Sequence, residues 1–478
     1  MHLPKRAART AGPHSQQGAA ALLLILTMIV ILTIVLAPRL TLWQVHNAAG
    51  GRGYQTLMDA KTAILAHAAN PGADTVPGRR LGQISLTPDL PVLAGSGFDG
   101  LSKPGCATRT WAPGQALIDP NSFATPLNVR CFGRFPWLSF GLPGPSTPDD
   151  QLGEVPWIFM SANLVVGAAC LANLNPLMLS SAYTGGCGTT VPFPWLRVVD
   201  ARGNLLSAEV AIVLILPGPP VQNGQTRSAP IDHAPAAYLE GLTVAAGCPA
   251  PCVPGTYSNA AYTVASGLNW TFIDAPASTS LSPPPSYYST PFQFNDHLIY
   301  ITAGEYFEAM EQRARLAVLN TLSTFRVSNG YLPYSGDYPS TPLASSCALH
   351  SRLGLLPQAL SCGGALNYPA WLSAAGWGSY FIYAVDPGCT AGAAAPRCLA
   401  PGLRLGGAAQ RYNAVLFSPG RAIQSAPYAA SKGAPQAPLG SGSLADFLDS
   451  ASNLAGPPFD AAGTPLTANY DDRMYGIP

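Results

Sequence analysis

The apolar pattern is most continuous near the start of the chain. An apolar run extends over residues 19–37, and its polar members are Thr27 and Thr33, whose hydroxyls can bond back to a helix backbone. At about 1.5 Å of rise per residue, roughly 20 apolar residues cross the hydrocarbon core of a bilayer. The run therefore predicts a transmembrane helix that ends before Pro38.

A short basic leader precedes this run and ends in Gly18. Its cations Lys5, Arg6 and Arg9 keep the N-terminus in the cytoplasm by the positive-inside rule and direct the rest of the chain outward. A secretory signal peptide is cut after its apolar run, whereas here the small residue that favours cleavage stands before it. Cleavage after Gly18 would leave the apolar helix in the mature protein. The alternative is an ordinary uncleaved signal anchor.

Shorter helical patterns follow the span. Leu57, Ala60, Ile64, Leu65 and Ala68 share one face at helical spacing, which predicts an amphipathic helix.

The clearest polar–apolar helix begins after Thr302. Thr302 with Glu305 three residues later is typical of a capping box. We expect the buried face to carry Phe307, Met310, Ala314, Ala317, Val318 and Leu322. We expect the solvent face to carry Glu305, Glu308, Glu311, Arg313 and Arg315.

A strand pair is predicted between these helices. Residues 196–199 and 208–216 are rich in β-branched and aliphatic side chains, and the sequence Asp-Ala-Arg-Gly-Asn between them is typical of a turn. Pro217 and Gly218 end the second strand. The aromatic residues Trp137, Trp157 and Trp195 are expected to supply core area.

Composition narrows the class of protein. Charged residues make up 10% of the 478 residues, well below ordinary soluble domains, and Gly and Pro number 48 each. These values indicate a loop-rich protein. The net charge is +1, and beyond the leader there is no Lys/Arg cluster, so we expect no nucleic-acid partner.

Ten cysteines all lie after the apolar run. An even number in an exported region indicates disulfides formed in an oxidising compartment. Pairing neighbours along the chain gives five short loops, and spacing alone leaves other connectivities open. The sequential pairs are Cys106 with Cys131, Cys170 with Cys187, Cys248 with Cys252, Cys347 with Cys362 and Cys389 with Cys398.

The pattern of reactive residues does not point to an enzyme. The sequence has no metalloprotease, nucleophile-elbow or P-loop motif, and its seven histidines are scattered. The pairs Asp232–His233 and Asp296–His297 could suggest general bases, but loop pairs of this kind are usually surface residues. A metal site at Cys248 and Cys252 is the alternative to a disulfide, and no second close pair completes a tetrahedral site. We expect no cofactor and no catalytic residues.

The leader and span, SQQG-AAALLL, resemble the N-terminus of type IV pilins and type II secretion pseudopilins. The resemblance implies that a prepilin peptidase cuts between Gly18 and Ala19. Most major pilins have a Glu at the fifth mature position, where this chain has Leu23. Within the superfamily this difference is typical of tip or minor subunits. Related tip pseudopilins bind calcium, and Asp446 with Asp449, or Asp471 with Asp472, would be the ligands here.

Further motifs resemble a group of proteobacterial pilin-like proteins over residues 15–240. The segments that match are Lys61–Ala68, Cys131–Trp137 with its Cys-x-Gly-Arg-x-Pro-Trp pattern, the Gly-Glu-x-x-Trp segment that ends at Trp157, and the strand before Pro217-Gly218. These motifs are specific to the family and are not catalytic.

The second half of the chain repeats the first in weaker form. Residues 350–358, 379–386, 411–420 and 445–453 echo residues 133–143, 156–163, 208–218 and 236–241 in the same order. We interpret this order as an internal duplication, and chance similarity of generic strands is the alternative. The predicted fold is α+β, with two pilin-like modules that each pack a helix on an antiparallel sheet and are stabilised by disulfides. The expected parts are a leader (1–18), a transmembrane helix (19–37), a first module (38–253), a Pro/Ser/Tyr-rich linker (254–294) and a second module (295–478).

The resemblance implies a non-enzymatic minor or tip subunit of a type IV pilus or type II secretion pseudopilus. Its partners would be the prepilin peptidase, other pilin or pseudopilin subunits, inner-membrane assembly proteins and membrane lipid. It would pass once through a bacterial inner membrane, with the C-terminal region in the periplasm or on a filament. The alternative is a membrane-anchored binding or adhesion protein that does not enter a filament.

Overall fold

The computed structural model divides the chain into two compact units, Met1–Thr56 and Leu57–Pro478. It describes residues 53–70, 131–143, 155–161, 195–218, 238–260, 271–276, 293–336, 352–357, 366–374, 376–393, 397–405, 410–420 and 472–478, together with 164, 176, 444, 448, 453 and 457–459. The predicted leader and apolar run lie outside these residues. Within them, no helix combines the length and the apolar character that a membrane span requires.

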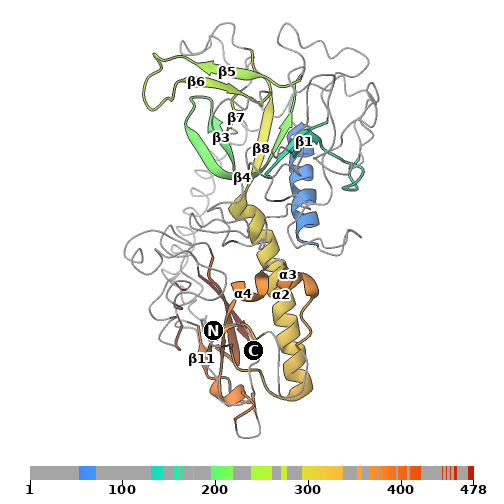
Figure 1. Cartoon of the computed structure of the whole chain (residues 1–478), viewed down its shortest axis with the longest axis vertical. Coiled ribbons are helices and arrows are strands. Elements are labelled where there is room, and N and C mark those ends of the chain that lie inside the picture. Colours follow the sequence, from blue (N-terminus) through green and yellow to red (C-terminus); the bar gives the residue numbers. More distant parts are fainter. Residues whose placement is uncertain are drawn as a thin grey trace, which may run out of the picture. The chain divides into compact units, whose positions relative to one another are not determined.

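The described residues form a mixed α+β fold in which two β-sheets, one mixed and one antiparallel, are the largest elements (Figure 1). The first is a six-stranded sheet in the order β1-β2-β4-β3-β7, and β8 also pairs with β4. Neighbouring strands of this sheet are antiparallel, except that β3 and β7 run parallel to each other. The strands are β1 (Cys131–Arg134), β2 (Trp157–Met160), β3 (Leu196–Asp200), β4 (Leu205–Leu216), β7 (Thr271–Asp274) and β8 (His297–Thr302).

The predicted strand pair is confirmed as the β3–β4 hairpin, although β4 starts three residues earlier than the sequence suggests. The first half of β4 is largely exposed, and from Val210 onward every residue is buried. Exposure falls at Val210 because β2 and β8 pair only with the second half of β4 and cover it from both sides. Trp157 in β2 is fully buried as expected, and Trp137 and Trp195 are partly buried against the core.

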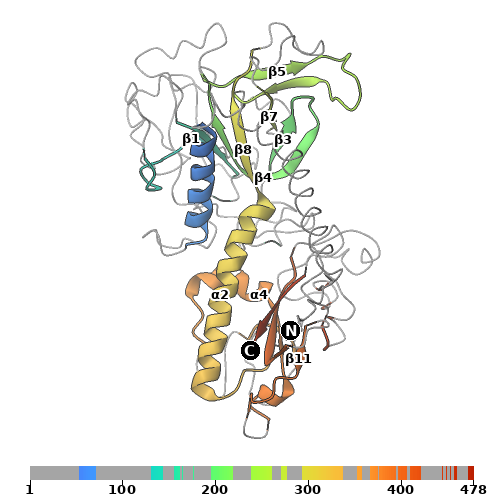
Figure 2. The same cartoon turned by 180° about the vertical axis from the view of Figure 1, so that it is seen from behind.

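A helix over residues 53–68 lies beside the first sheet (Figures 1 and 2). Four members of its predicted apolar face, Leu57, Ala60, Ile64 and Ala68, are completely buried in the same core cluster as residues of β2 and β4. Lys61 on this helix donates to the carbonyl of Tyr300 in β8 at 3.2 Å and pairs with the Glu305 carboxylate at 2.6 Å. The apolar face and this cation together attach the helix to β8.

The second sheet has four strands in the order β14-β13-β10-β9, all antiparallel. Two short helices, α3 and α4, precede β10, and a 3-10 turn follows it. The bounds are β9 (Leu353–Leu355), α3 (Ala370–Ala374), α4 (Trp377–Tyr380), β10 (Ile382–Val385), the 3-10 turn (Pro387–Cys389), β13 (Ala414–Ser418) and β14 (Arg473–Ile477). Two hairpins complete the fold, β5 (Gly241–Val244) with β6 (Gly255–Ser258), and β11 (Leu403–Arg404) with β12 (Arg411–Tyr412).

Helix α2 (Ala303–Asn329) continues directly from β8 (Figure 1). The predicted N-cap is confirmed, because the Thr302 hydroxyl accepts a hydrogen bond from the backbone N–H of Glu305 at 3.1 Å. Gly330, at φ 72°, ends the helix in the left-handed conformation that glycine adopts without strain. Near the start of α2, the ring of Phe307 packs against that of Trp195, which directly precedes β3, with the ring centroids 6.2 Å apart.

The expected solvent face of α2 is wrong at Glu311, which is 5% exposed. Residue 311 lies one turn after Phe307 and one turn before Ala314, so helical spacing places it on the buried face. We expected Glu311 to be exposed because of its charge, and its position on the helix was not taken into account. The predicted core residue Ala317 is only partly buried, whereas Phe307, Met310, Ala314, Val318 and Leu322 are buried as predicted.

The stretch over 254–294 differs from the predicted linker. Strands β6 and β7 lie within it, and β7 pairs with β3 of the first sheet. The predicted second module would start at residue 295. However, β8 belongs to the first sheet, because it pairs with β4 between His297 and Thr302. One core cluster contains residues of both sheets and of α2. The two sheets are therefore joined by a packed helix.

Three of the four echoed pairs of segments contribute strands at corresponding places in the two sheets, whereas the fourth pair, 236–241 and 445–453, contributes none to them among the described residues. One row of paired residues crosses four strands of the first sheet: Arg134 (β1), Trp157 (β2), Ile215 (β4) and Leu298 (β8). The corresponding row of the second sheet is Leu355 (β9), Ile382 (β10), Phe417 (β13) and Met474 (β14).

A backbone hydrogen bond supports this register. Just after β2, the Ser161 N–H donates to the Ala211 carbonyl at 2.8 Å. Just after β10, the Asp386 N–H donates to the Asn413 carbonyl, also at 2.8 Å. In both sheets the donor lies four residues after the row residue of its strand, Trp157 or Ile382. The acceptor lies four residues before the row residue of the neighbouring strand, Ile215 or Phe417. The two sheets thus share strand order, direction and register, which is the pattern that an internal duplication predicts.

Two of the five sequential cysteine pairs are disulfides in the structure, Cys248–Cys252 and Cys389–Cys398. Cys106, Cys170, Cys187, Cys347 and Cys362 lie outside the described residues, and so does the side chain of Cys131.

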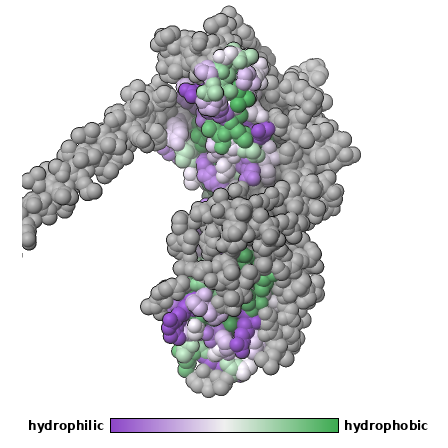
Figure 3. Space-filling view, turned by 90° about the vertical axis from the view of Figure 1, so that its left-hand side faces the viewer, coloured by the Kyte–Doolittle hydropathy of each residue, from purple (hydrophilic) through white to green (hydrophobic). Residues whose placement is uncertain are grey.

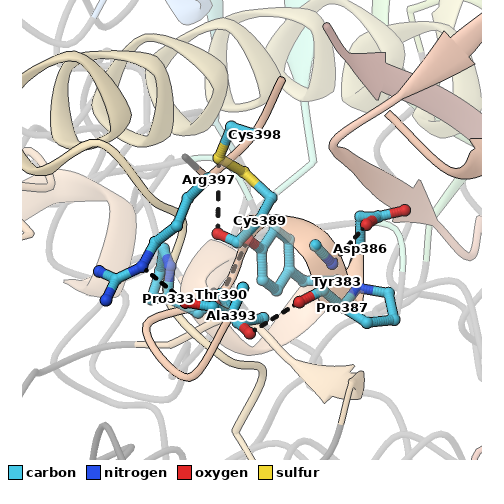
Figure 4. Close-up of a disulfide and its surroundings, with 10 residues drawn as sticks. Pro333, Tyr383, Asp386, Pro387, Cys389, Thr390, Ala393, Arg397 and Cys398 are labelled. Atoms are coloured by element: carbon cyan, nitrogen blue, oxygen red, sulfur yellow. Dashed lines mark hydrogen bonds between the residues drawn. A yellow bond between two sulfur atoms is a disulfide. The ribbon is translucent and has the colours of Figure 1, made fainter. Parts of the chain in front are cut away.

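The Cys389–Cys398 disulfide closes a loop against the C-terminal end of α2 (Figure 4). The buried Cys389 accepts a hydrogen bond at its carbonyl from the N–H of Leu332, just past α2, at 2.7 Å. The Arg397 guanidinium lies 5.2 Å from the ring centroid of Tyr331, a cation–π contact. These contacts attach the loop to the end of the helix.

Replacing Thr302 by Ala should destabilise the junction between β8 and α2. The change removes the hydroxyl that accepts from the Glu305 N–H, and the loss of such a cap costs about 1 kcal/mol. Thr302→Ser keeps the hydroxyl and serves as the matched control. Chemical denaturation of both variants measures the difference, and equal stability of the two would contradict the cap's role.

Candidate functional site

The Asp296–His297 pair, which the sequence offered as a candidate general base, lies at the start of β8. The two side chains differ in how deeply they are buried. Asp296 is 2% exposed, whereas His297 is only partly buried. Asp296 is instead brought together with Glu240, which directly precedes β5 and is fully buried. Asp232 and His233, the other such pair, lie outside the described residues.

Three chain segments meet at Asp296 through hydrogen bonds. Its Oδ2 accepts from the backbone N–H of Glu240 and from Asn259 Nδ2, both at 3.0 Å. Glu240 Oε2 in turn accepts from the backbone N–H of Asn295 at 3.1 Å. The segment before β5, the end of β6 and the start of β8 are therefore fastened to one another through the two carboxyl groups.

Asn259 extends this cluster to β7. Its Oδ1 accepts from the N–H of Ile273 at 2.9 Å, and its Nδ2 also reaches the Ile273 carbonyl at 3.2 Å. The Asn259 backbone N–H donates to the Glu240 carbonyl at 2.9 Å. A single buried amide side chain thereby completes the hydrogen bonding of β7 next to the carboxyl pair.

The surroundings of Asp296 act on its ionisation. Burial raises the pKa of Asp296 well above its usual range, and the neighbouring Glu240 carboxyl raises this pKa further. The hydrogen bond from Asn259 acts in the opposite direction and lowers the pKa. A neighbouring carboxyl of like charge and burial both disfavour the ionised form of a carboxyl group.

Arg134, in the motif that resembles the pilin-like proteins, is fully buried next to this region. Its guanidinium lies 4.5 Å from the ring centroid of Trp157 and 4.1 Å from that of Tyr238, two residues before Glu240. Arg134 Nη1 donates to the Val155 carbonyl at 2.7 Å. The motif arginine therefore fills the core between two aromatic rings and is not presented to a ligand.

The second sheet has a counterpart of Asp296. Asp296 lies two residues before Leu298 and directly precedes β8, and Asp472 lies two residues before Met474 and directly precedes β14, so the two positions correspond. Asp472 is 2% exposed and accepts from Nδ2 of the fully buried Asn453 at 3.2 Å. A buried aspartate bonded to an asparagine amide thus stands before the last strand of both sheets.

A second polar network ties α2 to the second sheet. Tyr380 donates its hydroxyl to Glu311 Oε2 at 3.4 Å and accepts from the Ser418 hydroxyl at 3.0 Å. Arg473 Nη1 lies 3.1 Å from Glu308 Oε1 and 3.9 Å from Glu311 Oε1. Burial raises the pKa of Glu311, while Ser418, Arg473 and Tyr380 each lower this pKa.

The hydrogen bonds of these groups give them a structural role. Both Glu240 and Asp296 are buried. Within the described part of the chain, no group of three or more His, Cys, Asp or Glu side chains could hold a metal ion. The calcium ligands expected at Asp446, Asp449 and Asp471 lie outside that part. Gly18 and Ala19 also lie outside it.

Sequence reasoning identified Asp296 but missed its partners. Glu240 and Asn259 are 56 and 37 residues away from it, respectively, and no local pattern links them. The available signal was the repeated acid before an apolar strand, Asp296-His-Leu-Ile and Asp472-Arg-Met-Tyr.

Comparison of the sequence with models of protein families finds no match. Comparisons with curated proteins and with solved structures find no match either.

Replacing Asn259 by Ala should destabilise the first sheet by about 2–4 kcal/mol. The N–H and carbonyl of Ile273 would both lose a buried partner, and each unsatisfied group costs about 1–3 kcal/mol. Thr256→Ala, at an exposed position of the same hairpin, is the control and should change stability little. Denaturant titration followed by tryptophan fluorescence measures both, and equal effects would show that the Asn259 contacts contribute nothing.

Proposed function

We propose that this chain is a large, non-enzymatic pilin-like subunit. A prepilin peptidase cuts it after Gly18, residues 19–37 anchor it in a bacterial inner membrane, and the remaining chain faces the periplasm. It then joins other subunits in a type IV pilus or a type II secretion pseudopilus, at the tip or another low-abundance position. No cofactor is part of this function.

The observation that carries the proposal is the order of the N-terminal features. A small residue stands directly before the apolar run, with basic residues ahead of it. A peptidase that cuts on the cytoplasmic side releases only the leader and leaves the helix on the mature chain. That helix would then serve both as a membrane anchor and as the part that packs against neighbouring subunits.

The fold of the described residues agrees with this function. A helix packed on a sheet is the arrangement expected of a pilin-like module, and the described residues include two sheets and two longer helices, the helix over 53–68 and α2, which supports the proposal. A subunit with two such modules is bulky for a repeating filament shaft. Its size and Leu23 together favour a tip or minor position.

A surface feature supports the alternative, a membrane-anchored adhesive protein. The disulfide-closed loop at residues 245–254 contains no charged residue and is largely exposed. Its Val253 is 48% exposed, and Leu205 and Leu206 of β4 are 49% and 46% exposed. The loop and the β3–β4 turn are joined by a hydrogen bond from the Val253 N–H to the Arg202 carbonyl at 2.8 Å. Figure 3 shows hydrophobic residues gathered on the described part of one face of the molecule.

Replacing Gly18 by Phe should block processing of the chain in cells that contain a prepilin peptidase. A bulky side chain at the position before the cut does not fit a peptidase that requires glycine there. Sequencing of the mature N-terminus, together with the shift in mass, measures the outcome, and the wild-type chain should start at Ala19.

The control is Gln16→Ala, which lies in the leader but leaves Gly18 in place. This variant should be cut normally in cells with the peptidase and not in cells that lack it. A wild-type chain that keeps its leader in both kinds of cell would exclude the filament route and favour the anchored adhesin.

A further inference from the structure

The loop of the β5–β6 hairpin presents an apolar surface without hydrogen-bonding side chains. The whole hairpin, residues 241–258, contains no charged residue. The loop itself, residues 245–254, consists of alanine, glycine, proline, valine and the two disulfide-bonded cysteines. All of these residues except the two cysteines are exposed. A ligand that is recognised through hydrogen bonds, such as a sugar or an anion, finds no side-chain partner on this loop.

Much of the hydrogen-bonding demand of the loop backbone is met within the protein. Three of the loop residues are prolines, which have no N–H. The N–H groups of Cys248 and Cys252 donate to carbonyls of the loop at 3.2 Å, and that of Val253 donates to the Arg202 carbonyl at 2.8 Å. Backbone groups that enter hydrocarbon must be hydrogen-bonded inside the protein. The loop therefore already satisfies part of what a lipid environment requires.

The loop is also held in place before it meets a partner. The Cys248–Cys252 disulfide closes it, and the Tyr257 hydroxyl donates to the Val253 carbonyl at 3.1 Å. Gly203 of the β3–β4 turn, at φ 80°, packs so closely that a Cβ there would collide with this carbonyl and this hydroxyl. A surface that is ordered beforehand loses less conformational entropy on binding.

An exposed cation lies beside the apolar loop. Arg202 is exposed in the β3–β4 turn, and its carbonyl accepts the hydrogen bond from Val253. The carboxylate of the nearby Asp200 is engaged within the turn, where it accepts from the N–H groups of Arg202 and Asn204, both at 2.8 Å, and from Asn204 Nδ2 at 3.0 Å. A cation next to an apolar surface is complementary to a lipid, in which an anionic phosphate stands next to hydrocarbon.

We propose that the loop 245–254 inserts into the interface of a lipid bilayer, with the Arg202 guanidinium at the phosphate of an anionic lipid. The partner is lipid, because an uncharged apolar surface without hydrogen-bonding side chains gains free energy by leaving water and not by directional contacts. This membrane contact is separate from the anchor at residues 19–37 and from assembly into a filament.

Photocrosslinking of the full chain, held in lipid nanodiscs and mixed with vesicles of the same lipid, tests the insertion. Phosphatidylcholine with phosphatidylglycerol supplies neutral and anionic headgroups. With the photoreactive residue p-benzoylphenylalanine in place of Ala250, irradiation should attach lipid to the loop, which mass spectrometry of the peptide detects. The matched control carries the same photoreactive residue in place of Asn320, which is exposed on α2, and should give little lipid adduct. The hairpin lies at the end of β8 that is farther from α2 (Figures 1 and 2).

Second changes in the chain that is photoreactive at residue 250 separate the apolar and the charged contributions. Val253→Asp should lower the yield of lipid adduct roughly tenfold, because a carboxylate opposes entry into the apolar region. Asn320→Asp adds the same charge on α2 and should leave the yield unchanged. Arg202→Gln should lower the yield when phosphatidylglycerol is present and leave it unchanged in phosphatidylcholine alone.

A lipid yield at residue 250 no greater than that at residue 320 would overturn the proposal, and so would an adduct with protein in place of lipid. Equal yields for Val253→Asp and Asn320→Asp would also overturn it. An effect of Arg202→Gln that is the same in both lipids would exclude the contact with the phosphate. Cleavage after Gly18 is measured separately by N-terminal sequencing, so failure of the lipid contact and failure of the proposed function are distinguishable.

Discussion

The direct continuation of β8 into α2 is the constraint on which the rest of the fold depends. Thr302 is at once the last residue of β8, paired with Val210 of β4, and the N-cap of the 27-residue helix α2. No loop separates the two elements, so the direction of the strand fixes the start and the direction of the helix. Near its start α2 packs through Phe307 on Trp195, which directly precedes β3, and its next turns bond to Tyr380 of α4 and Arg473 of β14.

Buried polar groups specify how the strands before and around this junction come together. An aspartate precedes the final strand of each sheet, and each is bonded to an asparagine amide from a distant segment. Burying such groups costs free energy unless their partners are in place, so an incorrectly paired arrangement would leave a charge or an amide unsatisfied. The apolar strands alone can slide by two residues without changing faces. Asp296 and Asp472 remove that freedom at the start of β8 and β14.

The local elements of the fold could be predicted from the sequence, because their signals lie within a few residues of one another. The faces of the helix over 53–68, the β3–β4 hairpin and the Thr302 cap are examples. The predicted linker failed for a different reason. Strand β7 pairs in parallel with β3, and the register of two distant segments leaves no local periodicity to read.

The carboxyl pair could be predicted only in part, for the same reason. Asp296 is recognisable as an acid before an apolar strand, but Glu240 reaches it from 56 residues away. The burial of Glu311 was missed for a different reason, because the prediction gave more weight to its charge than to its position on the helix. The partners that make its burial tolerable, Tyr380 and Ser418, are separated from it by dozens of residues.

The two described disulfides each stabilise only a short stretch of the chain. Cys248–Cys252 and Cys389–Cys398 join residues separated by 4 and 9 positions, so each restricts only a small loop and contributes roughly 2–3 kcal/mol in the chain-entropy model. Neither of these two bonds connects the two sheets. Among the described residues, the shared apolar core and polar ties of α2 such as Glu308 to Arg473 hold the two sheets together.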